Sequence, residues 1–222
     1  MKSLVMFVVA AAFVAAAWGT DCVIEPAASA PGVPEDAYTG DTMELKWDSG
    51  TGRWWLCWYT GLNTWVGNDF DITTIAAYTT IDTIRLQSRS NWPNSVWDGF
   101  RLGIYGFAGG VPGSLIWGPQ FVVPTGSTGW KDFAVGWVLP TGVSRFIAAQ
   151  EQYYDYPSCE AFLIDNNPTF LGHSWLYEGG TWSLFESPSV APYRNLMIRV
   201  IVDSGTIDVA PLSVGRVKAL YY

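Results

Sequence analysis

Short β-type runs between turn-forming residues constrain the fold of this chain more than any other feature. From about Asp41 onward, runs rich in β-branched and aromatic side chains recur between clusters of Gly, Pro, Asn and Asp. Beyond the N-terminal segment, no stretch of ten or more residues keeps the apolar period of a helix, because Gly, Pro or β-branched residues interrupt every candidate. The pattern predicts an all-β fold with little or no helix.

The spacing of the runs predicts a single antiparallel β-sandwich that is jelly-roll-like. We expect strands at about 43–48, 53–59, 64–71, 80–88, 96–107, 115–123, 129–138, 143–151, 159–165, 172–178, 181–186 and 195–203. Several runs alternate between two faces. Phe100, Leu102 and Ile104, for example, alternate with Arg101 and Tyr105. Alternating faces imply two packed sheets.

The first 19 residues, 1–19, have the pattern of a secretory signal peptide. Lys2 precedes an apolar run of about 14 residues, shorter than the roughly 20 that span a bilayer, and Ala17 and Gly19 supply small residues before a cut at Thr20. We therefore expect a secreted protein, extracellular or at the cell surface, with no membrane span in the mature chain. A lipoprotein anchored at Cys22 is the alternative.

The chain after the signal peptide divides into three parts. Residues 20–40 are rich in Pro, Ala and Gly, so we expect an extended leader that builds no regular ladder. Residues 41–203 are expected to form the sandwich domain. Residues 204–222 are a last strand, the start of a following module or a strand lent to a neighbouring subunit.

Charge and cysteine content narrow the function classes. The 12 Lys and Arg residues against 20 Asp and Glu residues argue against nucleic acid as a partner. His173 is the only histidine and there is no CxxC motif, which makes a zinc site improbable. Cys57 and Cys159 are the pair that we favour for a disulfide, and the alternative is two buried thiols.

No catalytic motif stands out in the sequence. If the chain is a glycoside hydrolase, Glu151 and Glu160 are the best candidates for its carboxylate pair. We expect no cofactor, although calcium could bind at an acidic turn that contains Asp69 and Asp71. A solvated acidic turn is the simpler interpretation.

Aromatic residues supply the better candidates for ligand binding. A sugar ring stacks its C–H face on Trp or Tyr while polar neighbours bond its hydroxyls. In the run 54–59, neighbouring side chains alternate, so either Trp54 and Trp58 face outward or Trp55 and Tyr59 do. Most of the other Trp residues are expected in the core. The candidate ligand-binding residues are Trp54, Trp58, Trp92, Tyr153, Tyr154 and Tyr156.

Four segments carry a resemblance to a known family. They are Trp97-Asp98-Gly99-Phe100, the tip Gly109 to Leu115, Gly129-Trp130, and Asn195 to Val200. Over about 41–203 the chain resembles the bacterial secreted jelly-roll-like modules of surface and exported multi-domain proteins that carry a sorting domain. The resemblance implies an extracellular, non-catalytic role in adhesion, glycan contact or assembly with other copies of the chain. A carbohydrate-active enzyme on the same scaffold is the alternative.

Overall fold

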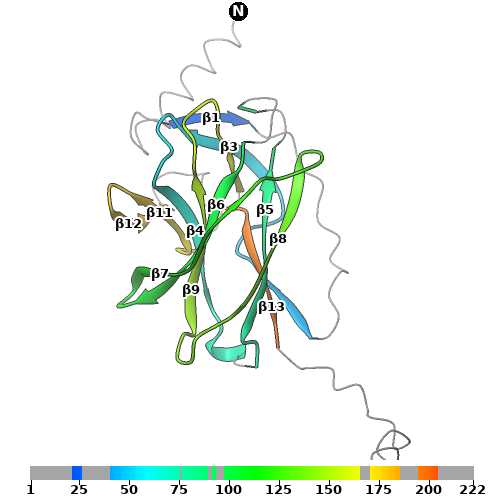
Figure 1. Cartoon of the computed structure of the whole chain (residues 1–222), viewed down its shortest axis with the longest axis vertical. Helices are drawn as coiled ribbons and strands as arrows, with labels where there is room; N and C mark the ends of the chain where they lie inside the picture. Colours follow the sequence, from blue (N-terminus) through cyan, green and yellow to red (C-terminus); the bar gives the residue numbers. More distant parts are fainter. Residues whose placement is uncertain are drawn as a thin grey trace, which may run out of the picture.

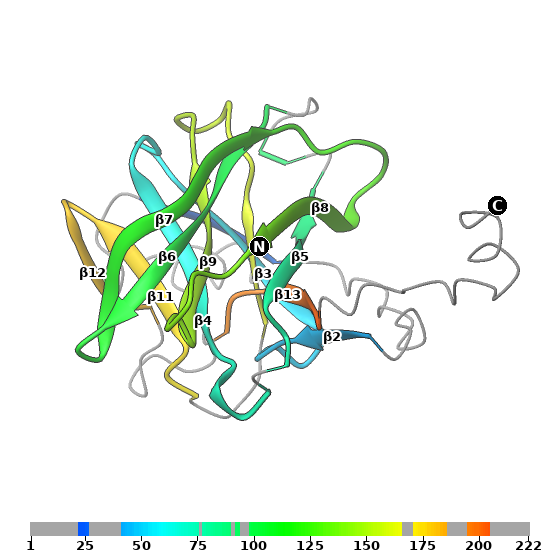
Figure 2. The ribbon, with the colours of Figure 1, turned by 60° about the horizontal axis from the view of Figure 1, so that its bottom comes forward.

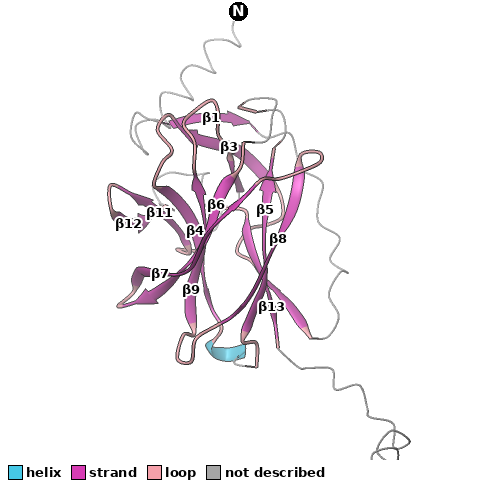
Figure 3. Ribbon diagram, viewed as in Figure 1, coloured by secondary structure: helices cyan, strands magenta, loops and turns pink. Residues whose placement is uncertain are grey.

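The structure is a computed structural model that describes residues 22–26, 41–75, 77–89, 92–93, 98–165, 171–185 and 195–204. Its elements are listed here in chain order: β1 (Cys22–Pro26), β2 (Thr42–Leu45), β3 (Gly52–Trp58), β4 (Thr64–Asp71), η1 (Thr73–Ile75), β5 (Thr80–Ser88), β6 (Phe100–Ala108), β7 (Val111–Val122), β8 (Gly129–Val138), β9 (Arg145–Gln152), β10 (Phe162–Asp165), β11 (Ser174–Glu178), β12 (Thr181–Leu184) and β13 (Ile198–Asp203). Apart from the short 3-10 helix η1, all regular structure in the described part is strand (Figure 3). The all-β prediction is confirmed.

The strands form antiparallel sheets arranged as a sandwich (Figure 1). The large sheet has six strands in the order β12-β11-β4-β9-β6-β7, and the small sheet has four in the order β2-β13-β5-β8. A three-stranded end sheet, β1-β3-β10, crosses the top of the view. A β-bridge between Ile164 and Leu196 joins the end sheet to the chain just before β13. The small and end sheets thus form one layer opposite the large sheet.

The main core lies between these two layers. Val66 and Phe70 of β4 and Phe100 of β6 bury their side chains against residues of the opposite layer such as Ile84 and Val200. The predicted alternation in β6 is confirmed, because Phe100, Leu102 and Ile104 join this core. Burial of these apolar side chains is the main stabilising contribution of the sandwich.

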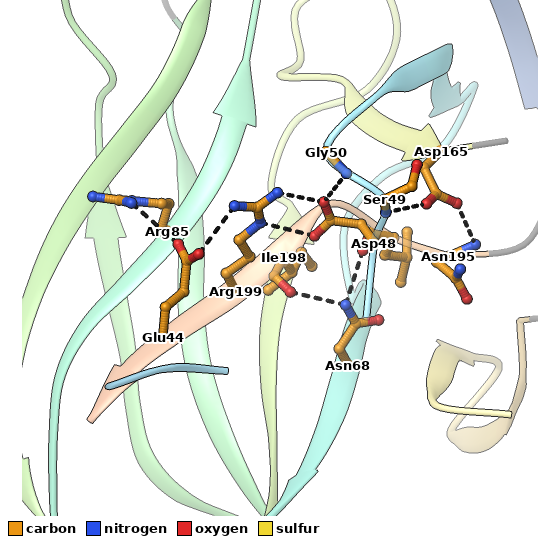
Figure 4. Close-up of polar contacts among 11 residues, drawn as sticks. Glu44, Asp48, Ser49, Gly50, Asn68, Arg85, Asp165, Asn195, Ile198 and Arg199 are labelled. Atoms are coloured by element: carbon orange, nitrogen blue, oxygen red, sulfur yellow. Dashed lines mark hydrogen bonds and ion pairs between the residues drawn. The ribbon is translucent and has the colours of Figure 1, made fainter. Parts of the chain in front are cut away.

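A buried polar group also ties the two layers together. Asn68 of β4 donates hydrogen bonds of 2.9 Å from Nδ2 to the carbonyl oxygens of Leu196 and Ile198 (Figure 4). Ser174 of β11 donates to Asn68 Oδ1 at 2.7 Å and accepts from the Leu196 N–H at 3.1 Å. The buried Asn68 side chain therefore fixes the position of β4 and β11 relative to β13.

Arginine and acidic side chains form a second network on the outer side of the small sheet. Arg199 bonds Asp48 through Nε at 2.9 Å and through Nη2 at 2.6 Å, and its Nη1 reaches Glu44 at 3.1 Å (Figure 4). Glu44 also accepts from Arg85 at 3.1 Å, and Arg85 binds Asp132 of β8. This network links all four strands of the small sheet and the segment after β2.

One expectation about the leader is wrong. Residues 20–40 were expected to form no regular ladder, yet β1 pairs antiparallel with β3, with Cys22 opposite Trp58 and Pro26 opposite Trp54. Pro26 takes the last position of β1, at the edge of the end sheet, where the missing N–H of a proline is tolerated. The expected signal peptide, most of the leader and nearly all of 204–222 lie outside the described residues.

No helix in the described part is long and apolar enough to cross a membrane.

Candidate functional site

The outer face of the large sheet carries a second set of aromatic side chains. Phe70 and Val66 of β4 point into the core, so Trp65, Gly67 and Asp69 point outward. Trp65, Tyr105, Ile147, Ala149 and Trp175 form an apolar cluster separate from the main core, and Phe107, Tyr177 and Trp182 pack against it. A sandwich does not need an aromatic cluster on this side, because the core between its sheets is already filled.

The large sheet curls around this outer face. Its two edge strands, β12 and β7, contact each other although four strands lie between them in the sheet. Figure 2 shows β12 and the first part of β7 next to one another on one side of the molecule. A curled sheet has a concave face, so the outer aromatics line a hollow.

This hollow, which we call the sheet groove, has a volume of about 660 Å³. Its lining residues are Asn63, Trp65, Arg101, Tyr105, Val111, Pro112, Gly113, Ser114, Leu115, Tyr177, Gly180, Thr181 and Trp182. A second hollow of about 620 Å³ adjoins it and shares Asn63, Tyr177 and Gly180. Volumes of this size are typical of small-molecule sites.

Ring contacts hold the floor of the sheet groove in place. Tyr105 packs edge-to-face against Trp65, with ring centroids 5.4 Å apart, and against Trp182, with centroids 5.0 Å apart. Tyr177 contacts Trp182 from the other side at 5.2 Å. Trp65 and Tyr105 are nearly buried, whereas Tyr177 and Trp182 are half-buried and present ring surface to the groove.

Small residues allow the Trp65 ring to lie close to the sheet. A Cβ atom on Gly103 would come within 3.1 Å of Trp65 Cζ3 and within 2.9 Å of Leu115 Cδ1. Cross-strand pairing puts Gly103 beside Ala149, and Ala149 beside Gly67. This row of small side chains leaves the space that the aromatic rings occupy.

Arg101 and Glu151 form an ion pair at one end of the sheet groove. Glu151 is fully buried and accepts from Arg101 Nε, from Arg101 Nη2 at 2.6 Å and from the Asn63 N–H at 2.9 Å. The hydrogen bond to Glu151 raises the pKa of Arg101 above its usual value, so the guanidinium remains charged. Because the carboxylate offsets this charge, the groove offers hydrogen-bond donors without a net positive charge.

Asp69 anchors the other end of the outer cluster. Its Oδ1 accepts from Trp175 Nε1 at 2.8 Å, its Oδ2 accepts from Arg145 Nε at 2.8 Å, and His173 Nδ1 lies 3.3 Å from both oxygens. Burial alone would raise the pKa of Asp69, but the hydrogen bonds from His173, Trp175 and Arg145 outweigh it and lower the pKa. The carboxylate thus holds the Trp175 ring and β11 in place.

The contacts of Asp69 bear on the calcium hypothesis. Donor groups surround both of its oxygens, and an oxygen of Asp71 accepts from the Thr73 N–H at 2.8 Å, as in a capped turn. In the part of the chain that the structure describes, no group of three or more His, Cys, Asp or Glu residues is placed to hold a metal ion. Calcium binding stays a prediction.

The predicted ligand-binding aromatics fall in different places. Tyr153 is half-buried and Tyr154 is 40% exposed. Both contact Phe121, and Tyr153 also lies beside Arg101, which lines the sheet groove. Tyr156 packs edge-to-face on the exposed Tyr59, with ring centroids 5.5 Å apart. Only Tyr153 and Tyr154 therefore lie near the groove.

The expectation for the run 54–59 is wrong in part. Trp58 is 1% exposed and belongs to the main core, so it is no surface residue, while Tyr59 is exposed. Trp55 is buried as well, in a third cluster with Ala161, Leu163 and Met197.

Strand β3 is thus buried on both faces, and simple alternation could not separate core from surface. Trp54 is half-buried on the end sheet, and Trp92 packs against the third cluster. Neither residue lines the sheet groove.

The two candidate catalytic carboxylates have different hydrogen-bond partners. Glu151 pairs with Arg101, whereas Glu160 is buried and accepts from the Asp98 N–H at 3.0 Å. The two share no hydrogen-bond partner, and neither lines the sheet groove. Their role as the carboxylate pair of a glycoside hydrolase stays a prediction.

The predicted disulfide is absent. Cys57 and Cys159 are both buried, and no disulfide joins them, so the alternative of two buried thiols holds. Cys57 lies in a strand whose neighbours already fill both faces, where a small apolar side chain is favoured.

The residues that form the sheet groove itself were not among the candidates from the sequence. Trp65 and Trp182 fell among the Trp residues expected in the core, while Tyr105 was expected on the face of its strand opposite Phe100 but was not proposed as a binding residue. A signal for them was present: in 64–71 and 100–107 the outward positions combine Trp or Tyr with glycine, as in Trp65-x-Gly67 and Gly103-x-Tyr105. Glycine between outward aromatics indicates a surface on which rings lie flat.

Comparison with known proteins shows the fold but no family. A scan against models of known protein families finds no match, and neither does a search of curated proteins. A solved structure of the cysteine protease and lectin-like domains of Cwp84, a surface-layer-associated protein of Clostridium difficile, is similar with a TM-score of 0.56 and 15% identity. The match covers 75% of this chain and 36% of that one.

A second structure, the clostridial cysteine protease Cwp84 after propeptide cleavage, gives a TM-score of 0.50 at 14% identity and covers 75% of this chain and 41% of that chain. This chain therefore spans well under half the length of either neighbour. The all-β fold that the resemblance implies agrees with these matches, and both neighbours are structures of Cwp84. Nothing in the comparisons supports the sorting domain. The chain is similar to these proteins in fold.

Proposed function

We propose that this protein is a secreted, non-catalytic module of the bacterial cell surface that binds glycans in the sheet groove. The observation that carries the proposal is a concave groove of about 660 Å³ whose lining combines Trp65, Tyr105, Tyr177 and Trp182 with polar side chains. Stacked sugars need such apolar ring faces, and their hydroxyls need donors and acceptors beside them.

The polar lining suits the hydroxyl groups of a neutral sugar. Asn63, Ser114 and Thr181 offer both donors and acceptors, and Arg101 offers donors whose charge Glu151 offsets. A strongly anionic ligand would find no net positive charge in this lining. The groove therefore favours uncharged carbohydrate over acidic ligands.

Two further observations support a surface role. The neighbours in fold come from a surface-layer-associated protein, and one of them contains a lectin-like domain. The apolar N-terminal run has the pattern of a secretory signal. In this proposal, the protein uses the bound glycan for adhesion.

The test is glycan binding by the mature chain and by single variants. Trp182→Ala removes a half-buried ring from the groove and is expected to weaken affinity about tenfold, the equivalent of about 1.4 kcal/mol for one ring contact. Trp54→Ala is the matched control, because it removes a half-buried tryptophan outside the groove and should leave affinity unchanged.

The measurement is a glycan array followed by titration calorimetry with the soluble oligosaccharide that binds best. Equal losses in both tryptophan variants would contradict the placement of the site. Release of reducing sugar from the bound oligosaccharide would contradict the non-catalytic assignment and return attention to Glu151.

A further inference from the structure

We propose that the binding surface continues from the sheet groove over Arg101 to Tyr153, Tyr154 and Phe121, so that it takes a linear neutral oligosaccharide laid across the strands. We call this surface the aromatic track; it comprises Trp182, Tyr105, Trp65, Arg101, Tyr153, Phe121 and Tyr154. The inference rests on the proposed function and names its ligand class, a chain of several sugars.

The pairing register puts the parts of the aromatic track on one face. Tyr177 of β11 lies opposite Trp65 of β4, and Trp65 lies opposite Glu151 of β9. Glu151 lies opposite Arg101 of β6, and Arg101 lies opposite Phe121 of β7. Directly paired residues of antiparallel strands share a face. The row therefore crosses five strands, and four strand spacings of about 4.8 Å give a path of about 19 Å along the curled sheet.

Ring contacts and cation–π contacts connect the aromatic track without a gap. Trp182 contacts Tyr105 at 5.0 Å, and Tyr105 contacts Trp65 at 5.4 Å. The Arg101 guanidinium lies 5.8 Å from the Trp65 ring centre and 4.8 Å from that of Tyr153. Arg101 thus bridges the groove floor and the aromatic group at the edge of the sheet.

The far end of the track is exposed. Tyr153 packs edge-to-face on Phe121, with centroids 5.3 Å apart, and on Tyr154, with centroids 4.8 Å apart. Phe121 is 46% exposed and Tyr154 is 40% exposed, although both are large apolar rings. Such rings, continuous with a lined groove, indicate a binding surface.

The shape and charge of the track favour a sugar chain. The track places aromatic rings on both sides of the Arg101 guanidinium, with Asn63 beside it in the groove, and this combination of apolar faces and polar groups matches a chain of rings that carry hydroxyls. A protein partner would need a broad buried patch with a ring of polar contacts around it. The bidentate pairing of Arg101 with Glu151 also leaves no net charge to select an acidic ligand.

The experiment compares oligosaccharide lengths within one neutral series. Disaccharide to hexasaccharide forms of cello-, xylo-, manno- and chito-oligosaccharides are titrated into the mature chain by calorimetry. Affinity is expected to rise at least tenfold from the disaccharide to the hexasaccharide of the series that binds. Phe121→Ala and Tyr154→Ala should reduce hexasaccharide affinity toward that of the disaccharide and leave disaccharide affinity unchanged.

Two control variants separate this inference from the proposed function. Trp182→Ala should weaken both lengths, while Tyr59→Ala, which removes an aromatic ring 52% exposed and outside the track, should weaken neither. Equal wild-type affinity for both lengths would overturn the track and leave groove binding intact. Absence of binding to any oligosaccharide would overturn the proposed function as well.

Self-association is measured in parallel. We expect no dimer formed through Phe121, so the wild type and Phe121→Ala should sediment alike at increasing concentration. A dimer that disappears in this variant would assign the exposed rings to a contact between copies and overturn the inference.

Discussion

Glu160 is a buried carboxyl that should make the stability of this protein depend on pH. Its side chain is 2% exposed, Oε1 accepts from the Asp98 N–H at 3.0 Å, and Oε2 has no hydrogen-bond partner in the structure. Burial raises the pKa of Glu160 to about 7 from a usual value of 4.5, against the opposing effect of the Asp98 N–H. The neighbouring Asp98 carboxylate raises the pKa further.

The direction of the pH effect follows from proton linkage. Between pH 4.5 and about 7 the folded protein keeps the Glu160 proton while the unfolded chain loses it. Unfolding therefore releases a proton, and the free energy of unfolding falls as the pH rises through this window. A difference of about 2.5 pKa units corresponds to roughly 3 kcal/mol of stability that is present below pH 4.5 and lost above pH 7.

Glu160→Gln removes the titration while keeping the size and the accepting oxygen of the side chain. We expect the variant and the wild type to be equally stable at pH 4.5, and the variant to be more stable by up to about 3 kcal/mol at pH 8. Urea unfolding followed by tryptophan fluorescence at several pH values measures the difference, with the exposed Glu178→Gln as a control that should show none. A wild-type-to-variant difference that is the same at every pH would refute the reasoning.

Three further predictions test the structure at other points. Asn68→Ala should lower the free energy of unfolding by about 2 to 4 kcal/mol in urea titrations, because two buried carbonyls lose their donor. Asp48→Asn breaks a buried ion pair and should cost about 3 kcal/mol, whereas Asp132→Asn, at an exposed carboxylate, should cost under about 1 kcal/mol; equal losses would contradict the role of burial. Glu151→Gln uncovers the charge of Arg101 and should raise affinity for uronate-containing oligosaccharides up to about fivefold by calorimetry, while unchanged affinity would contradict the charge argument.

The strand pattern could be predicted from the sequence because it depends on local properties. Turn residues ended the strands 64–71, 80–88 and 129–138 where the structure ends them. β1 could not be predicted, because its only regular contact in the described chain is the ladder with β3, and a Pro-rich segment gives no local signal for such pairing.

Burial on both faces explains the errors in the run 54–59. The alternation rule assumes that one face of a strand meets solvent. In β3, Leu56 and Trp58 belong to the main core while Trp55 belongs to the third cluster, so apolar side chains pack on both faces of the strand. The exposure of each tryptophan therefore depends on how the three sheets pack, and the sequence of one strand does not determine that packing.

The position of the aromatic residues on the surface also differs from the expectation. Aromatic residues in loops were expected to be exposed, and most aromatic residues in strands were expected in the core. The curling of the large sheet reverses this for Trp65, which lies in a strand but lines the concave outer face. Tyr105 lies on the outer face, as the alternation of its strand predicts.

The outer rings lie away from the main core that joins the two layers. The main core between the layers contains Phe70, Phe100 and Phe146, while Trp65 and Tyr105 belong to a separate cluster on the opposite face of the same strands. Filling the space at Gly103 would displace Trp65, since a Cβ there lies 3.1 Å from its ring. A sheet that serves only as a layer of a sandwich gains nothing from small residues that make room for rings on its outer side. The proposed glycan binding therefore rests on three features of this face together: the outward rings, the small residues beneath them and the arginine whose charge a carboxylate offsets.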